Sequence, residues 1–320
     1  MKLFPEGQRV GLGGAPLGNL LGEVHEGDAI ATVNAAWDEG WRYFDTAPHY
    51  GLGLAEERLG LGLRGKPRDE YVLSSKVGRI IYEASDAAVD DEGFEVSTTR
   101  RRRWDFSRDG VLQSIEDSLR RIGTDRLDVV YVHDPDDHYE EAVATAFPTL
   151  IELRDQGVIG AIGSGMNQTA MLTRFVQEID IDVIMLAGRY SLIDPDALDD
   201  VLPACLQNDV QVVAVGIFNS GLLSQPRPAA GATFNYEPAA QPLVDKANKI
   251  ADICESHNTT LPAAALAFPL AHPAVAGIAV GCRTADEVHT NATLSRTEVP
   301  PAVWSDLKSA GLLRDDAPTP

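Results

Sequence analysis

The chain has 320 residues, of which 44% are hydrophobic and 23% are charged, and its formal net charge is -21 at pH 7. This hydrophobic content is enough for a sizeable core and excludes general disorder. The strong negative charge argues against nucleic acid and anionic membranes as partners, because their phosphate groups would be repelled.

The three cysteines, Cys205, Cys254 and Cys282, lie far apart and show no metal-ligand spacing. We therefore expect neither a disulfide framework nor a metal site, and reduced thiols are typical of the cytoplasm. No signal-peptide core and no run of about 18 apolar residues is present. These features predict a cytoplasmic protein without a membrane anchor, and they leave its oligomeric state open.

The chain begins with a predicted strand over 9–12, a glycine-rich loop over 11–19, a helix over 28–39 and a strand over 41–44. The loop contains GLGGAPLG, which is similar to a dinucleotide-binding fingerprint. No βαβ unit with an acidic residue about 20 positions later supports that function, so we interpret the segment as a loop.

A long segment over 77–104 shows no regular pattern, which is uncommon unless such a segment serves as a binding loop or lid. It contains four consecutive arginines, Arg100 to Arg103. We expect them to form a solvated surface cluster, with a specific anion site as the less favoured alternative. Ser107 is the expected N-cap of the following helix. The predicted elements around this segment are a helix over 54–63, a strand over 71–75 and a helix over 109–122.

The remaining chain repeats the same alternation, with a Pro- and Gly-rich loop over 225–242. We expect strands over 127–132, 158–162, 182–186, 210–215 and 276–280, and helices over 139–156, 169–177, 196–208, 244–256, 262–271 and 284–294. Eight strands that alternate with helices predict a (β/α)8 TIM barrel, an α/β fold, as a single domain over residues 1–320. An open doubly wound sheet is the alternative, disfavoured because polar candidates follow many strands and not one switch point.

Four candidate catalytic residues lie at or just after predicted strand ends: Asp45, Tyr50, Lys76 and His133. All strand C-termini of a barrel face one rim, so these residues are expected to converge. A tyrosine titrates near pH 10 in water, and a neighbouring ammonium group favours its phenolate. We expect Lys76 to poise Tyr50 for proton transfer, Asp45 to hold Lys76 by an ion pair, and His133 to orient a substrate oxygen.

Taken singly, each of these residues also has a purely structural explanation. A strand-end Asp is often a helix cap, a Tyr a packed aromatic, a Lys a solvated side chain and a His a core group. Their joint occurrence favours an acid/base site for a carbonyl/alcohol pair.

Several motifs resemble the aldo-keto reductase superfamily. They are FDTAPHYG with the following GLAEERLG (44–60), SSKVGR (74–79) and VHDPD (132–136). Within that superfamily, HYGLGLAEERLG, IGSGMNQ (162–168) and VGCRTADEV (280–288) are similar to the D-threo-aldose 1-dehydrogenase or L-fucose dehydrogenase group, with pyridoxal 4-dehydrogenases as close relatives. The resemblance implies a barrel that uses NAD or NADP without a Rossmann domain, and its catalytic tetrad falls on the same four residues.

The resemblance also implies cofactor contacts. The nicotinamide carboxamide is expected at Asn167, with Ser164 as a further contact, and the nicotinamide ring against Phe218. A glycine-containing turn suits the pyrophosphate, and the adenosine end follows it. The implied residues are Asn219, Ser220, Gly221 and Leu222 for the pyrophosphate, and Gly281, Arg283, Thr284 and Asn291 for the adenosine.

Two departures from the family pattern bear on the choice of cofactor. Many NADP-using members carry a Lys at the position of Gly281 and a basic residue near Glu287, and Glu287 would repel a 2′-phosphate. We therefore expect NAD, with NADP as the alternative because Arg283 lies nearby. The segment around Ala187 and Gly188 lacks the Gln common in reductases of the superfamily.

The expected substrate is a small sugar or another hemiacetal, with hydride transfer from C1 of an aldose such as L-fucose. Pyridoxal oxidation and general aldehyde or ketone reduction are alternatives, as is a non-catalytic nucleotide-binding regulatory subunit, which an intact tetrad disfavours. Specificity is expected to lie in the active-site loops 78–105 and 225–242, with His49 and Trp104 as substrate contacts.

Overall fold

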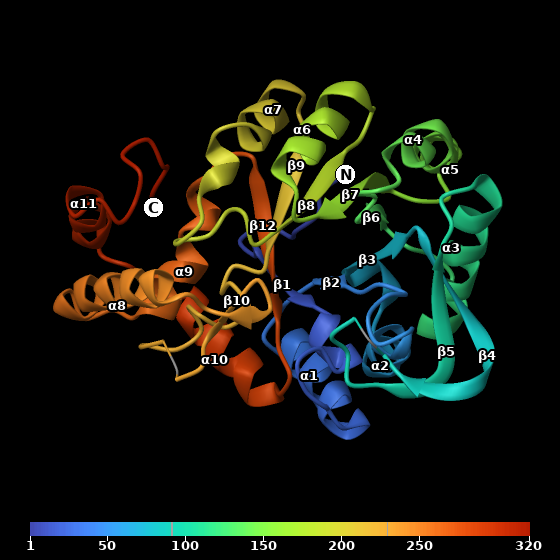
Figure 1. Cartoon of the computed structure of the whole chain (residues 1–320), viewed down its shortest axis with the longest axis horizontal. Helices are drawn as coiled ribbons and strands as arrows, with labels where there is room; N and C mark the ends of the chain where they lie inside the picture. Colours follow the sequence, from blue (N-terminus) through green and yellow to red (C-terminus); the bar gives the residue numbers. More distant parts are fainter. Residues whose placement is uncertain (91, 229) are drawn as a thin grey trace.

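The computed structural model describes residues 1–90, 92–228 and 230–320, so residue 91 of the first predicted loop and residue 229 of the second lie outside the described residues. Eight parallel strands form a closed barrel in the order β1-β12-β9-β8-β7-β6-β3-β2, and the helices surround it (Figure 1). The predicted TIM barrel is confirmed. The barrel strands are β1 (Val10–Gly13), β2 (Tyr43–Asp45), β3 (Val72–Val77), β6 (Val129–His133), β7 (Ala161–Met166), β8 (Val183–Ala187), β9 (Gln211–Val215) and β12 (Val275–Gly281).

The helices follow the predicted alternation. They are α1 (Glu26–Asp38), α2 (Leu54–Leu63), α3 (Arg108–Ile122), α4 (Tyr139–Glu141), α5 (Phe147–Asp155), α6 (Thr169–Glu178), α7 (Val201–Gln207), α8 (Gln241–Ser256), α9 (Leu261–Ala267), α10 (Ala285–Ser295) and α11 (Pro301–Ser309). Short 3-10 turns are η1 (Ala15–Gly18), η2 (Arg68–Glu70), η4 (Asp196–Leu198) and η5 (Pro269–Ala271), and η3 (Ala142–Ala146) is a π-helical turn.

Local capping explains where some of these helices begin and end. The Ser107 hydroxyl accepts a hydrogen bond from the Gly110 N–H at 3.1 Å, which confirms it as the N-cap of α3. The helix expected over 196–208 is divided into η4 and α7, because Asp200 leaves helical geometry and caps α7. The helix α11 was not predicted, although its buried Trp304 and Leu307 show helical spacing.

Side-chain alternation along the strands determines which residues enter the barrel. Tyr43 and Tyr131 lie inside, and their hydroxyl oxygens are 2.9 Å apart. Because every second residue of a strand faces the same side, Asp45 follows Tyr43 inward and His133 follows Tyr131. The strand pattern thus directs both side chains into the C-terminal mouth of the barrel.

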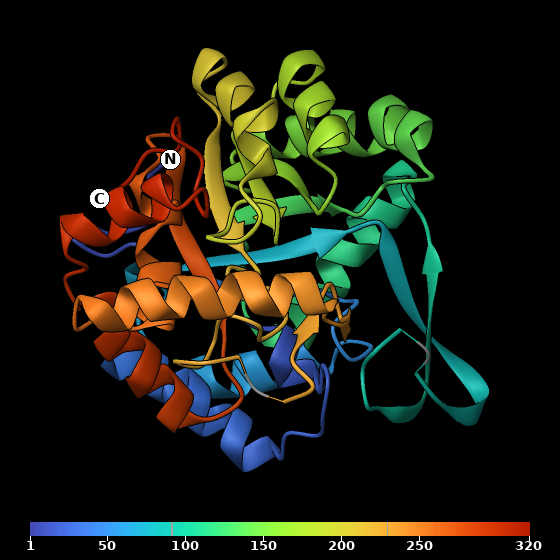
Figure 2. The same cartoon turned by 60° about the vertical axis from the view of Figure 1, so that its left-hand side comes forward.

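The segment 77–104 contains a long antiparallel hairpin, so the prediction of an irregular segment is wrong. Strand β4 (Arg79–Val89) pairs with β5 (Ser97–Trp104), with Arg79 opposite Trp104. The hairpin extends away from the barrel (Figure 2). Strand β5 is polar except for Trp104, and the apolar residues of β4 do not alternate strictly with polar ones, so neither strand shows the pattern of a strand half-buried on a hydrophobic core.

The arginines of β5 form ion pairs, so the expectation of a solvated cluster is wrong for Arg100 and Arg102. Arg100 pairs with Glu57 of α2 at 2.7 Å. The Arg102 side chain is only 9% exposed and pairs with Asp90 and Glu92. Carboxylates from α2 and from the turn after β4 therefore neutralise these guanidinium groups.

The predicted loop over 225–242 contains a small hairpin of β10 (Thr233–Phe234) and β11 (Glu237–Pro238). Its two turn residues, Asn235 and Tyr236, have φ angles of 51° and 65°. Two successive left-handed residues are typical of a tight type I′ hairpin turn. Within the described chain, no helix is both long and apolar enough to cross a membrane.

Candidate active site

A buried ion pair lies in the mouth of the barrel. Lys76 Nζ lies 2.9 and 2.7 Å from the two carboxylate oxygens of Asp45 and also donates to the Thr46 carbonyl at 2.9 Å. The Ser74 hydroxyl donates to Asp45 at 2.7 Å. Burial raises the pKa of Asp45 and lowers the pKa of Lys76, and the ion pair opposes both shifts. Asp45 therefore anchors Lys76, as predicted from the sequence.

Tyr50 lies in a loop that is held by close backbone contact with η1. A Cβ added to Gly51, whose φ is 62°, would meet the Gly18 carbonyl at 2.4 Å. A Cβ on Gly18 would in turn meet the Tyr50 carbonyl at 2.7 Å. Gly18 of the predicted loop over 11–19 thus allows close packing against the Tyr50 backbone, which gives that segment a structural function.

The Tyr50 ring lies between Lys76 and His133. The Lys76 ammonium is 4.6 Å from the ring centroid, and the His133 ring is nearly perpendicular to it at 5.8 Å. Burial raises the pKa of Tyr50 well above its usual value, and the charges of Asp45 and Asp134 act in the same direction. This is opposite to the shift expected from Lys76, because desolvation of the phenolate dominates.

His133 and His49 are two neutral histidines beside Tyr50. Their ring centroids are 5.6 Å apart. Burial, together with the charges of Arg79 and Lys76, lowers the pKa of His133 well below 6.5. Burial and the nearby cations lower the pKa of His49 to about 2. A neutral imidazole still has one N–H to donate, which suits the predicted role of His133.

Several neighbours of these residues have no role that the sequence predicts. The Arg79 guanidinium pairs with Asp134 at 3.2 Å and lies 3.9 Å from the centroid of Trp104. Phe94, from the turn between β4 and β5, packs 5.1 Å from His49. Arg79 and Asp134 lie within the recognised motifs, whereas nothing in the sequence places Phe94 here.

Trp104 lies at the rim, beside the tetrad but not within it. Its side chain is 42% exposed and packs against Phe106 and His138, with centroid distances of 5.6 and 5.1 Å. With Arg79 over its ring, Trp104 acts as a support for that guanidinium group, and its role as a substrate contact stays a prediction.

The two residues expected at the carboxamide lie on β7 and directly after it. Asn167 follows β7, and its carbonyl accepts a hydrogen bond from Arg189 Nε at 3.1 Å. Ser164 has the strand parity of Ile162, which packs in the outer core, and its hydroxyl donates to the Val132 carbonyl at 3.0 Å. This placement gives no support to Ser164 as a cofactor contact.

The expected pyrophosphate turn follows β9. Asn219, Ser220 and Gly221 have φ angles of 46°, 58° and 104°. The N–H groups of Asn219, Gly221 and Leu222 donate to carbonyls within the turn, at 2.8, 3.1 and 3.3 Å. The sequence predicted that the N–H groups of this turn bind the pyrophosphate. Because three of them donate to carbonyls within the turn, fewer N–H groups are free for that contact than expected. Phe218 is partly buried against the outer core.

The expected adenosine residues gather at the start of α10. Thr284 caps the helix by accepting from the Glu287 N–H at 3.2 Å, and the Glu287 carboxylate accepts from the Arg283 N–H at 2.7 Å. Gly281 is exposed at the end of β12, and Asn291 Nδ2 lies 3.4 Å from Cys282 Sγ. Glu287 thus sets a negative charge at the position where a 2′-phosphate is expected.

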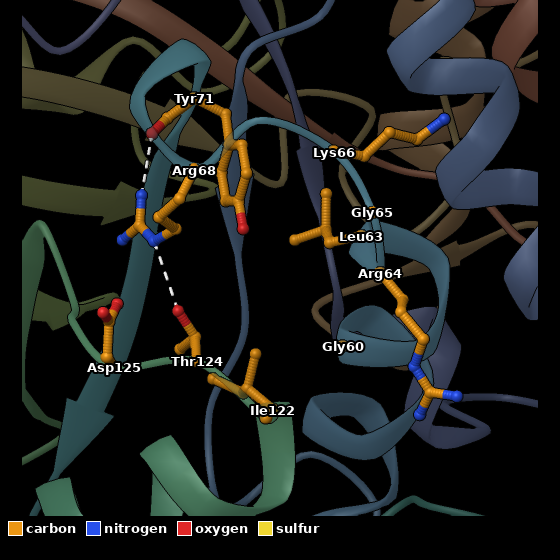
Figure 3. A pocket seen from close by; sticks show the side chains of 11 residues that line it. Gly60, Leu63, Arg64, Gly65, Lys66, Arg68, Tyr71, Ile122, Thr124 and Asp125 are labelled. Carbon is orange, nitrogen blue, oxygen red and sulfur yellow. Dashed lines mark hydrogen bonds between the residues drawn. The ribbon is translucent and has the colours of Figure 1, made fainter.

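A hollow of about 550 Å³ is lined by residues at the C-terminal ends of α2 and α3 and in the segments that follow them (Figure 3). Its lining includes Tyr71, just before β3, and Thr124 and Asp125, which precede β6. Since the tetrad lies at the strand C-termini, this hollow is separate from it, and the described lining residues include none of the four.

Comparison with known proteins shows the family. The model of the aldo/keto reductase family matches residues 9–311. The chain belongs to the aldo/keto reductase family. An aldo-keto reductase from Bacillus halodurans, solved in its holo form, matches with a TM-score of 0.72 and 25% identity, covering 96% of this chain and 92% of that one.

Two curated aldo/keto reductase relatives match almost end to end. The D-threo-aldose 1-dehydrogenase of a Pseudomonas species is 44% identical, over 97% of this chain and 95% of the relative. The pyridoxal 4-dehydrogenase of Microbacterium luteolum is 37% identical, over 95% and 94%. The protein is therefore an oxidoreductase of the aldo-keto reductase type, a family that uses NAD(P)H.

Proposed function

We propose that this protein oxidises the anomeric C1 hydroxyl of an aldose, L-fucose or another D-threo-type sugar, to the aldonolactone. The observation that carries the proposal is the 44% identity, over nearly the whole chain, to a D-threo-aldose 1-dehydrogenase. The geometry is compatible with this chemistry, because Asp45, Lys76, Tyr50 and His133 converge at one end of the barrel.

In this proposal a bound nicotinamide cofactor would supply the hydride acceptor for C1. Tyr50 accepts the proton of the C1 hydroxyl, and neutral His133 donates a hydrogen bond that orients the sugar oxygen. Asp45 fixes Lys76 against the Tyr50 ring. Because burial raises the pKa of Tyr50, oxidation should become faster as the pH rises toward that pKa.

We propose NAD as the preferred cofactor, with NADP as the alternative. The carboxylate of Glu287 at the start of α10 would repel a 2′-phosphate, and Gly281 supplies no compensating cation. The Arg283 Nη1 group already donates a hydrogen bond to the Leu21 carbonyl, at 3.4 Å. Asn167 and Phe218 are the proposed nicotinamide contacts. The other proposed cofactor contacts are Asn219, Ser220, Gly221 and Leu222 for the pyrophosphate, and Gly281, Arg283, Thr284 and Asn291 for the adenosine.

Pyridoxal is the second candidate substrate, because the 37% identical relative is a pyridoxal 4-dehydrogenase. The two functions share the same reaction at a ring C–OH. A panel of aldoses and pyridoxal, each with NAD and with NADP, separates them by the absorbance of the reduced cofactor. Turnover of pyridoxal but of no aldose would replace the first proposal by the second.

Tyr50→Phe tests the proposed base. The variant keeps the ring against Lys76 and His133 but lacks the proton acceptor, so kcat should fall by about a hundredfold or more. Cofactor binding, measured by quenching of intrinsic fluorescence, should stay close to the wild-type value. Near-normal turnover with intact binding would reject the role of Tyr50.

A further inference from the structure

A second ion pair lies beside the predicted tetrad, and the proposed reaction gives it no role. Arg79 begins β4 and Asp134 directly follows His133. Arg79 Nη2 lies 3.2 Å from Asp134 Oδ2, and the same oxygen lies 3.4 Å from His133 Nε2. The pair therefore contacts the residue expected to orient the sugar oxygen.

The backbone of Asp134 adopts an unusual conformation at this point. Its φ is 43°, in the left-handed region, which is energetically costly for most residues but better tolerated by Asp. Its N–H donates to the Gly165 carbonyl at 3.1 Å, which fixes the turn directly after β6. Strained residues of this kind are concentrated at functional sites, so the carboxylate is a candidate for a specific contact.

The two carboxylates near the tetrad differ in what they can still accept. The Asp45 side chain is 4% exposed, and both of its oxygens are bound by Lys76. The Asp134 side chain is 34% exposed, and its Oδ1 takes part in none of the hydrogen bonds among the described residues. Asp134 is thus the accessible acceptor of the two.

The Arg79 side chain is buried, whereas the Asp134 side chain is partly exposed. The Arg79 side chain is 8% exposed, with the Trp104 ring over the guanidinium group at 3.9 Å. Its Nε and Nη1 are buried and have no hydrogen-bond partner within the described chain. Arg79 is therefore placed to hold Asp134 from the protein side and not to contact a ligand first.

Each of the two carboxylates beside the predicted tetrad is paired with a cation. Arg79 compensates Asp134, as Lys76 compensates Asp45, and His133 is neutral. The open carboxylate of Asp134 suits a ligand that carries hydroxyl donors, because a phosphate or carboxylate group would be repelled by it. A sugar has such donors next to C1.

We propose that Asp134 is a substrate-binding residue, whose carboxylate accepts a hydrogen bond from the hydroxyl group on C2 of the aldose, and that Arg79 is the residue that positions it. The proposal rests on the proposed aldose function. The proximity of Asp134 to His133 motivates the choice of C2, because the C2 hydroxyl is the neighbour of the reacting C1 hydroxyl.

The test compares the best aldose of the panel with its 2-deoxy analogue. Wild-type kcat/KM should be at least about tenfold higher for the parent sugar, since hydrogen bonds to a charged group contribute strongly. In Asp134→Asn this ratio should fall close to one. Asp137→Asn, an exposed change in the same loop, is the matched control and should keep the wild-type ratio.

Arg79→Met tests the positioning role. It should raise KM and lower the same ratio, and the double variant should be no worse than Asp134→Asn alone, because the two residues act as one unit. Arg79→Lys should restore part of the ratio. Thermal unfolding and cofactor binding show that each variant is folded.

Two negative results have different meanings. If wild-type enzyme oxidises no aldose, the proposed function fails and this assignment fails with it. If wild-type enzyme oxidises aldoses but Asp134→Asn slows the parent and 2-deoxy sugars equally, only the assignment of Asp134 is overturned.

Discussion

Asp45 and Lys76 are a mutually dependent pair inside the barrel. Their side chains are 4% and 2% exposed, so neither charge is compensated by water. A buried pair of this kind adds little stability compared with apolar residues, but removal of one partner leaves an isolated charge. The pair therefore fixes the position of Lys76 against Tyr50, but it makes the stability of the fold sensitive to the loss of either partner.

Asp45→Asn should lower the free energy of unfolding by about 3–5 kcal/mol, because Lys76 loses its counter-charge in a buried position. Urea unfolding followed by circular dichroism measures this change. The double variant Asp45→Asn with Lys76→Met removes both charges and should recover much of the loss. A single variant as stable as the wild type would show that water or another group already compensates Lys76.

This part of the site is predictable from the sequence because strand alternation is a local property. Asp45, Lys76 and His133 lie on strands whose pattern can be read directly. The pKa of Tyr50 was not predictable, because it depends on burial by residues far along the chain. Phe94 packs 6.0 Å from the Tyr50 ring, and only the fold brings them together.

At the scale of elements, the β4–β5 hairpin lies outside the barrel, but the turn between its strands contacts the site. The turn between its strands is attached to the loop after η1: Leu21 N–H donates to Gly93 at 3.3 Å and Glu95 N–H to Asn19 at 3.0 Å. Phe94 between them is 4% exposed and contacts His49. The sequence predicted a functional loop here but not its strands, because cross-strand ion pairs leave no apolar alternation.

Replacement of residues 82–101 by Asn-Gly would join Ile81 to Arg102, which are already paired, through a two-residue turn. The barrel does not include these residues, so the melting temperature should change by less than about 5 °C. KM should rise about tenfold or more, because Phe94 no longer packs against His49. Circular dichroism and steady-state kinetics measure the two effects. Loss of cooperative unfolding would instead show that the hairpin is required for the barrel.

At the scale of the whole molecule, barrel closure followed from the sequence because eight strand-helix units leave few alternative topologies. The two hairpins, the π-helical turn and α11 add to that frame without altering it. They depend on long-range pairing and local capping, which a single sequence indicates only weakly. The pairing of Arg100 with Glu57 across two elements is one example.

Global stability should fall as the pH decreases from neutrality. The pKa values of His49, His133 and His272 are lowered in the folded protein, mainly by burial. The unfolded chain takes up protons near pH 6.5, so it binds more protons than the native state below that pH. The contribution of these neutral histidines to stability is complete above pH 6.5. It is lost as the pH falls toward their pKa values in the folded protein.

Urea unfolding at pH 7.5, 6.5 and 5.5 should therefore show a decreasing free energy of unfolding, with a slope of up to about 1.4 kcal/mol per pH unit for each histidine. His133→Asn should reduce this slope, because the variant lacks one of the histidines whose pKa burial lowers. Because the pKa of Asp45 is raised in the folded protein, protonation of Asp45 in acid opposes this loss of stability. The comparison of the wild type with His133→Asn isolates the contribution of His133. Equal stability at pH 7.5 and 5.5 would mean that these histidines become protonated without unfolding.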